Sequence, residues 1–195
     1  IRWITPAEEA SVLALLPRAE ALAVYIAIRT GLRRGELLEL QQRDVEPLWV
    51  HLWGTGTKSG KGRSIPLTLD VFNALQEFFS LGKTTIEGLR YHWNTARDAL
   101  GLSGDPDFVF HATRHTFATR AVQAGVHPRV LQRLMGHADL ATTMRYMQVS
   151  DGMLASAIHQ IADHGGGLQG GGIALDTPSG LAATSLKTLR HQEVK

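Results

Sequence analysis

The chain has 195 residues, a length that suits one domain of ordinary size with some excess. Hydrophobic residues make up 44% and charged residues 19%, so a packed core is expected and the composition argues against global disorder. The net charge of +2 neither demands nor excludes a nucleic acid partner, and the absence of cysteine excludes disulfides and thiolate zinc sites.

Neither a membrane span nor a signal peptide is visible in the sequence. A bilayer-spanning helix requires about 20 consecutive apolar residues, and no such stretch occurs. The lack of cysteine fits a reducing cytoplasm, which is the expected location. Because the chain begins with Ile1 rather than Met, we expect it to be a fragment of a longer protein.

Local patterns predict a mainly α-helical chain interrupted by one small antiparallel β-sheet, an α+β fold class. Thr5 and Pro6, followed by two glutamates, predict a helix start, because acids favour the positive end of the helix dipole. The run 48–53 predicts a strand, and a second strand returns at 63–67 after a basic, glycine-rich turn at 55–62. The remaining expected helices cover 19–28, 32–42, 68–79, 84–100, 111–124, 128–135, 140–149 and 153–162.

Two glycine triplets, at 165–167 and 170–172, predict a flexible linker that separates the helical domain from the end of the chain. We therefore expect one domain at 1–164 and a linker with a disordered tail at 165–195. No internal repeat is present.

Two arginines are expected on inward faces of separate helices. Arg114 shares a stripe with Phe117 and Ala118, and Arg33 shares a face with Leu37. A structural salt bridge to a buried carboxylate is an equally good interpretation of Arg114 alone, and Arg33 alone is better explained by pairing with the nearby Glu36. Taken together, two inward guanidiniums favour a shared oxyanion.

A basic hairpin carries Lys58, Lys61 and Arg63. The simple interpretation is a solvated turn, and the functional one is a loop that contacts the DNA backbone. Further along the chain, Tyr146 is expected off the apolar side of its helix, so its hydroxyl need not be buried in the core. Arg145 beside it serves phosphate contact or solubility.

Three histidines lie in the same region as these basic residues. His137 follows Gly136 at a predicted helix end, where a histidine is more often a cap than a catalyst. His111 and His115 have the i, i+4 spacing of a zinc site, but no third ligand is obvious, so we expect no metal.

The order and spacing of five segments resemble the tyrosine recombinase (phage integrase) family. These segments are Thr30–Leu37, Thr57–Leu67, His111–Thr119, Leu134–His137 and Ala141–Tyr146. The resemblance covers about positions 4 to 150, nearly the whole family catalytic domain, and the family's N-terminal DNA-clamping domain is not expected in this chain. The sequence departs from the family pattern at Ala112–Thr113 and Arg34–Gly35.

The resemblance implies a catalytic set whose members act together on one DNA phosphate. Tyr146 would attack phosphorus, Lys58 would protonate the departing 5′ oxygen, and His111 would assist proton transfer to and from the tyrosine. The phosphate would be bound by two guanidiniums and an imidazole, those of Arg33, Arg114 and His137. A 3′-phosphotyrosyl intermediate would form without metal, cofactor or ATP.

The family also implies partners: double-stranded DNA, with Lys61, Arg63 and Arg145 as candidate contacts, and a homotetramer on two duplexes built by the terminal helix 153–162. An equally good interpretation is that this helix packs on its own domain. A DNA substrate would place the protein with the nucleoid. Three other functions remain open: a type IB topoisomerase, a non-catalytic DNA-binding remnant of the fold, and a metal-dependent nuclease.

Overall fold

The computed structural model describes residues 1–53, 62–147, 154–155, 157–159 and 161. The chain divides into two compact units, 1–148 and 149–195. Lys58 and Lys61 lie outside the described residues, as do the predicted glycine linker and tail. None of the described helices is long and apolar enough to cross a membrane.

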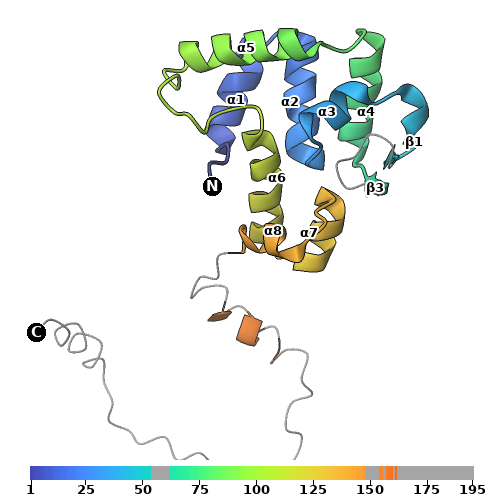
Figure 1. The fold of residues 1–195 in the computed structure, drawn as a ribbon, viewed down its shortest axis with the longest axis vertical. Coiled ribbons are helices and arrows are strands. Elements are labelled where there is room, and N and C mark those ends of the chain that lie inside the picture. Colours follow the sequence, from blue (N-terminus) through green and yellow to red (C-terminus); the bar gives the residue numbers. More distant parts are fainter. Residues whose placement is uncertain (54–61, 148–153, 156, 160, 162–195) are drawn as a thin grey trace, which may run out of the picture. The chain divides into compact units, whose positions relative to one another are not determined.

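The first unit is mainly helical, and its helices follow the predicted order (Figure 1). The prediction of a mainly α-helical fold with one small antiparallel sheet is confirmed. The described helices are α1 (Pro6–Leu15), α2 (Arg18–Thr30), α3 (Arg34–Glu39), the 3-10 turn η1 (Gln42–Asp44), α4 (Leu69–Ser80), α5 (Ile86–Ala99), α6 (Ala112–Gln123), α7 (Pro128–Met135) and α8 (Leu140–Met144).

Helix α1 begins where the sequence predicts. Thr5 and Glu8 form a capping box, in which each side chain accepts a hydrogen bond from the other residue's backbone N–H. One residue further on, Glu9 is buried and forms ion pairs with Arg29 of α2 and Arg120 of α6. Because these pairs join three helices, they help to fix α6, the helix that carries much of the site.

Helix α2 lies at the centre of the unit and packs against α1, α4, α5 and α6. It ends at Gly31, whose backbone is left-handed at φ 67°. A Cβ atom there would lie 2.5 Å from Cδ1 of Phe117 on α6, so glycine is required both by conformation and by this close approach. The approach brings the end of α2 against the middle of α6.

The sheet has the strand order β1 (Val45–Glu46), β2 (Trp49–Leu52) and β3 (Arg63–Pro66), with both pairs antiparallel. Val50 lies opposite Ile65, and both are buried against the helical core. Burying side chains of this size stabilises a fold by about 1.5–3 kcal/mol each. The predicted strands are confirmed to within a residue, and the short β1 is an addition.

Two predicted helices are shorter in the structure. The segment expected at 32–42 is helical at 34–39, so that Arg33 is the N-terminal cap of α3 rather than part of its face. The segment expected at 140–149 is helical at 140–144 and continues as a turn through Met147. Tyr146 therefore lies on a turn after α8, and helix periodicity does not decide which way its side chain points.

A small second cluster of apolar side chains lies between α6 and α7. It is formed by Ala118, Val122, Leu131 and Met135, with Phe117, Tyr146 and Met147 packed against it. This cluster holds the turn that carries Tyr146 against α6.

Candidate active site

Four segments carry the predicted catalytic side chains that the structure describes, which are all except Lys58. Arg33 comes from the start of α3, Arg114 from α6, and His137 from the residue after the left-handed Gly136 that ends α7. Tyr146 follows α8. Backbone contacts tie these segments to one another, because guanidinium nitrogens of Arg33 and Arg114 donate hydrogen bonds to carbonyl groups at the end of α7.

Arg114 is a buried cation, 2% exposed. Its guanidinium donates hydrogen bonds to the carbonyl oxygens of Gly31 and Met135, and it forms no ion pair within the described residues. Burial, followed by repulsion from Arg33 and Arg63, lowers the pKa of Arg114 to about 9. It is still cationic at pH 7, so the site holds a buried positive charge. In the described part of the chain, Arg114 forms no salt bridge to a buried carboxylate, so that alternative interpretation is not supported.

Glu36 is the carboxylate of the site, and two arginines share it. Nη1 of Arg33 lies 2.9 Å from Oε1, and Arg63 binds both carboxylate oxygens, at 2.8 and 2.9 Å. Although burial alone raises the pKa of Glu36, the hydrogen bonds from Arg63 and from the Arg33 backbone lower it to about 2. The Arg33–Glu36 pairing considered from the sequence is therefore present, and a second arginine accompanies it.

Arg63 does not occupy the solvent-facing position predicted for a DNA contact. Its side chain is 5% exposed, and besides binding Glu36 it donates a hydrogen bond from Nε to the carbonyl oxygen of Leu134 at 3.0 Å. The expectation that Arg63 contacts DNA stays a prediction: its charge is taken up by Glu36, although the residue also lines the cavity described below. Arg63 instead joins the hairpin to α3 and to the end of α7.

Tyr146 is half-buried, and its ring packs against the α6–α7 cluster. The sequence placed Tyr146 off the apolar side of a helix; in the structure it lies on the turn after α8, partly buried against this cluster. The hydroxyl lies 2.7 Å from Nδ1 of His115. Burial raises the pKa of Tyr146, while the positive charges of Arg114 and Arg145 oppose the increase. Arg145 itself is exposed.

All three histidines of the region have lowered pKa values. Partial desolvation is the largest cause in each, and neighbouring arginines add to it, so that the pKa falls to about 4 for His115 and for His137 and is below its usual value for His111. The three imidazoles are therefore neutral at pH 7. Nδ1 of His137 lies 2.9 Å from Oγ1 of Thr143, and its ring is parallel to that of Tyr146, with centroids 6.5 Å apart.

His115 is the residue that sequence reasoning missed. It was considered only as a partner of His111 for zinc, and the two rings do lie edge to face, with centroids 4.8 Å apart. Within the described residues, no group of three or more histidine, aspartate or glutamate side chains is placed to hold a metal ion. The useful clue was that His115 directly follows the inward-pointing Arg114 and so projects from α6 about 100° away from it.

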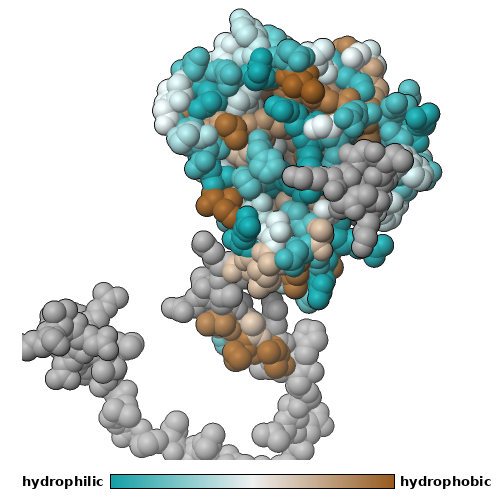
Figure 2. Space-filling model, in the orientation of Figure 1, coloured by the Kyte–Doolittle hydropathy of each residue, from teal (hydrophilic) through white to brown (hydrophobic). Residues whose placement is uncertain are grey.

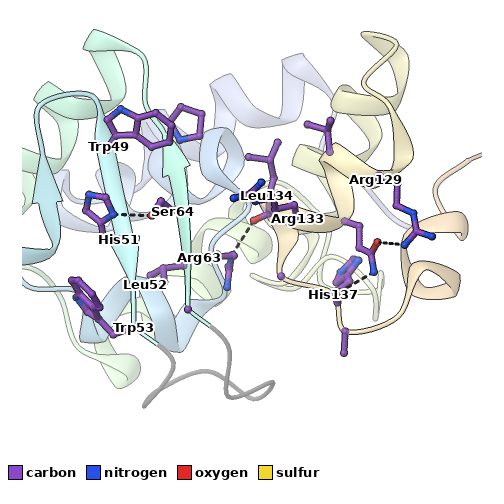
Figure 3. Close-up of a pocket in the computed structure, with 16 residues that line it drawn as sticks. Trp49, His51, Leu52, Trp53, Arg63, Ser64, Arg129, Arg133, Leu134 and His137 are labelled. Atoms are coloured by element: carbon purple, nitrogen blue, oxygen red, sulfur yellow. Dashed lines mark hydrogen bonds between the residues drawn. The ribbon is translucent and has the colours of Figure 1, made fainter.

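A cavity of about 1010 Å³ opens beside the site, between strands β2 and β3 and helix α7. Figure 3 shows Trp49, His51 and Trp53 along the strand side, and Arg129, Arg133 and His137 along the helix side. Arg129 and Arg133 are exposed, so the helix wall carries positive charge. The cavity has the aromatic and cationic lining that suits a polyanion.

The sequence matches the model of the phage integrase family over residues 2–153. The chain belongs to this family, and the matched part is a tyrosine recombinase catalytic domain. Its fold resembles that of the Tn1549 transposon integrase solved in complex with a circular intermediate DNA, with a TM-score of 0.67, 23% identity, and coverage of 81% of this chain and 65% of the other. The catalytic domain of bacteriophage HP1 integrase gives a TM-score of 0.60 at 24% identity, covering 82% and 94%.

Curated relatives are similar in sequence over most of this chain. A tyrosine recombinase of Pseudothermotoga lettingae is 34% identical over 148 residues, covering 69% of this chain and 51% of the relative. The integrase of Salmonella phage P22 is 30% identical over 184 residues, covering 83% and 47%. Tyrosine recombinase XerC of Mycobacterium tuberculosis is 31% identical over 176 residues, covering 80% and 57%. The chain thus spans about half the length of these relatives.

Proposed function

We propose that this chain is the catalytic domain of a site-specific DNA recombinase or integrase that cuts and rejoins double-stranded DNA through a 3′-phosphotyrosyl intermediate. One observation carries the proposal. Arg114 is 2% exposed and forms no ion pair within the described residues, yet it lies near the cation of Arg33 and the phenol of Tyr146. A buried cation of this kind is stabilised when an anion enters, and a phosphodiester offers the two charged oxygens that paired guanidiniums bind.

In the proposed reaction, the hydroxyl oxygen of Tyr146 attacks the scissile phosphorus and displaces the 5′ oxygen of the next nucleotide. Arg33 and Arg114 bind the two non-bridging oxygens, whose negative charge grows in the transition state. His137 donates a hydrogen bond to the phosphate, and Lys58 protonates the departing 5′ oxygen. Rejoining reverses these steps. The covalent link conserves the phosphodiester energy, so the reaction consumes no ATP, and the arginines supply the charge that a metal ion would otherwise provide.

The cavity beside the site is the proposed path of the DNA backbone. Arg129 and Arg133 line the helix side of this cavity. Clustered cations of this kind favour DNA binding, because they release counterions from the DNA phosphates. Lys61 and Arg145 are further proposed contacts, and the exposure of Arg145 supports its part. Changing both Arg129 and Arg133 to Gln should weaken binding to all sequences alike and reduce the salt dependence of binding by about one counterion for each residue.

Covalent trapping tests the proposal. The protein is incubated with a pool of randomised duplexes nicked close to the cleavable positions, so that the short cleaved strand diffuses away and the protein stays attached. Wild-type protein should give a denaturant-stable adduct. Tyr146→Phe should bind DNA and give none, while Tyr91→Phe, which alters a 67% exposed tyrosine on α5, should react normally.

Arg114→Ala should lose about 10²- to 10³-fold in the rate of adduct formation, as expected for removing one donor to a developing oxyanion, while its DNA binding changes far less. Equal loss of binding and cleavage contradicts its role in the transition state. Lys58→Ala should recover on a substrate with sulfur in the 5′ bridging position, because a thiolate leaves without a proton.

Other outcomes point to other functions. Binding without any adduct from the wild-type protein favours a non-catalytic DNA-binding remnant. Relaxation of supercoiled plasmid that lacks a recombination site favours activity of the type IB topoisomerase kind. Cleavage retained by Tyr146→Phe and abolished by a chelator favours a metal-dependent nuclease.

Assembly into a tetramer on two duplexes is part of the proposal, as is a location with the nucleoid DNA in the cytoplasm. The described residues of the second unit are helical, and Leu154, Ile158 and Ile161 are each more than half exposed. Figure 2 shows this described part as mainly hydrophobic. An exposed apolar helix face suits docking onto a neighbouring protomer. Changing the three residues to Ser should abolish the tetramer in sedimentation of the protein with its DNA, and an unchanged tetramer would contradict this role.

A further inference from the structure

The hydroxyl of Tyr146 is hydrogen-bonded to an imidazole that the reaction above does not use. Nδ1 of His115 lies 2.7 Å from the tyrosine oxygen, although 31 positions separate the two residues in sequence. Building on the proposed function, we propose that His115 is a further catalytic residue, which accepts the Tyr146 proton as the hydroxyl attacks phosphorus and returns it as the strands rejoin.

The position of His115 on α6 supports this role. It directly follows Arg114, whose guanidinium is fixed by the carbonyl groups of Gly31 and Met135. Successive residues of a helix project about 100° apart. The same rigid helix therefore directs Arg114 toward the proposed phosphate position and His115 toward the hydroxyl of Tyr146. This arrangement keeps the acceptor in register with the phosphate, which is the positioning that a fast intramolecular reaction requires.

The other two imidazoles are less suited to accept this proton. Nδ1 of His137 is taken up by the hydroxyl of Thr143, and in the described part of the chain no hydrogen bond joins His137 to Tyr146, whose ring lies 6.5 Å away between centroids. His111 lies against the ring of His115, and it makes no hydrogen bond to Tyr146 in the described part of the chain. His111, assigned above to assist the proton transfer, would then act through its contact with His115.

His115 is neutral before DNA binds, and in the tautomer that carries its hydrogen on Nε2 the lone pair on Nδ1 accepts the phenol hydrogen. Desolvation, the neighbouring His111, the amino terminus and Arg114 lower its pKa to about 4, and Asp107 opposes them. A DNA phosphate bound by the arginines adds negative charge nearby and raises this pKa toward the pH of the reaction. The base would thus gain strength when the substrate is in place, which is where general base catalysis is most effective.

The proton balance of the step is complete. A bond forms between the tyrosine oxygen and phosphorus as the bond from phosphorus to the 5′ oxygen breaks. The phenol proton moves to Nδ1 of His115, and the 5′ oxygen receives a proton from Lys58. In rejoining, the 5′ hydroxyl returns its proton to Lys58 and attacks phosphorus, and the departing phenolate takes its proton back from His115.

The test uses the full chain and the duplex that the wild-type protein captures from the randomised pool. His115→Asn places an amide near the position of Nδ1, where its oxygen accepts the phenol hydrogen bond but takes no proton. His92→Asn is the matched control, since His92 also lies edge to face with a tyrosine, Tyr91, with ring centroids 5.1 Å apart on α5. Circular dichroism and DNA binding establish that each variant is folded.

His115→Asn should bind the duplex normally and form the adduct about 10²- to 10⁴-fold more slowly, the usual range for losing a general base. Sulfur at the 5′ bridging position should not rescue it, because the missing step is on the nucleophile side, and the defect should shrink as pH rises. His92→Asn should react like the wild type. Cleavage by His115→Asn at the wild-type rate, faster cleavage, or rescue by sulfur would each overturn the proposal.

A second measurement is independent of cleavage. Nitrogen-15 spectra of the free protein should show Nδ1 of His115 unprotonated and hydrogen-bonded, with its resonance shifted by Tyr146→Phe and unaffected by Tyr91→Phe. A wild-type protein that forms no adduct, with this resonance behaving as expected, refutes the proposed function and removes any catalytic role for the contact. An active wild-type protein in which Nδ1 carries the proton refutes only the assignment of His115 as the acceptor.

Discussion

The ion pair between Arg63 and Glu36 is expected to be costly to break, because both side chains are buried. The side chains are 5% and 6% exposed, and two hydrogen bonds of 2.8 and 2.9 Å join them. We predict that Arg63→Met, which keeps the length of the side chain and removes its charge, destabilises the fold strongly. The physical reason is that Glu36 stays buried with only Arg33 to compensate it.

The magnitude follows from the pKa of the carboxyl group. The pKa of Glu36 falls from 4.5 to about 2 in the folded protein. One pKa unit is worth about 1.4 kcal/mol, so the surroundings favour the ionised form by about 3 kcal/mol. Of the groups that lower the pKa of Glu36, Arg63 has the largest effect. Removing one member of a buried pair generally costs about 3–5 kcal/mol. We therefore expect a loss of about 3 kcal/mol at pH 7.

Urea unfolding followed by circular dichroism measures the free energy of unfolding. The matched control is Arg18→Met, because Arg18 pairs with Glu77 at similarly short range but at the surface, where side-chain exposures are 66% and 40%. The control should be nearly neutral, since solvent screens an exposed pair. Equal effects of the two substitutions would refute the reasoning.

The same comparison has an expected pH dependence. Because the folded-state pKa of Glu36 is depressed, its stabilisation is fully present above pH 4.5 and is lost as pH falls toward about 2. The difference in stability between wild type and Arg63→Met should therefore narrow across that window. A difference that stays constant from pH 7 to pH 3 would show that lost packing, and not lost charge, causes the destabilisation.

Two further predictions concern the connection between α2 and α6 and the histidines of the site. Gly31→Ala should destabilise the fold clearly more than Gly125→Ala in thermal unfolding. Both glycines have positive φ, which costs about 1–2 kcal/mol for alanine. Only at Gly31 would the new Cβ also meet Phe117, at 2.5 Å. Equal shifts in Tm would show that Phe117 moves away freely. The second prediction is that stability rises with pH between about 4 and 6.5, because His115 and His137 bind fewer protons in the folded than in the unfolded chain across that range. Urea unfolding of a variant with both histidines changed to Asn should show a flatter pH profile, and an unchanged slope would contradict the lowered pKa values.

Local sequence patterns were sufficient for the order of the helices and for the small sheet. Capping at Thr5, the glycine stop at Gly31 and the aromatic run around Val50 each act over a few neighbouring residues, so they can be interpreted without the fold. The family segments around Arg33 and Arg114 were also identified from the sequence, because their spacing along the chain is itself the pattern.

The partners of the site residues could not be found in the same way. Where α3 and α8 end depends on the packing around them, and both helices are shorter than their apolar periodicity predicts. For that reason the position of Tyr146 on a turn was missed, since a residue on a turn is oriented by what it packs against rather than by a helical period.

What the sequence by itself determined is therefore the fold class and the family, and it predicted which segments form the candidate site. Only the tertiary structure decided which side chains of the candidate site contact one another. Arg63 meets Glu36 across 27 positions and His115 meets Tyr146 across 31, and no local propensity encodes such pairs. The first pair is enclosed where β3 packs against α7, and the second where α6 and α8 pack against α7. Enclosed polar groups must find partners among the groups that the fold brings within reach.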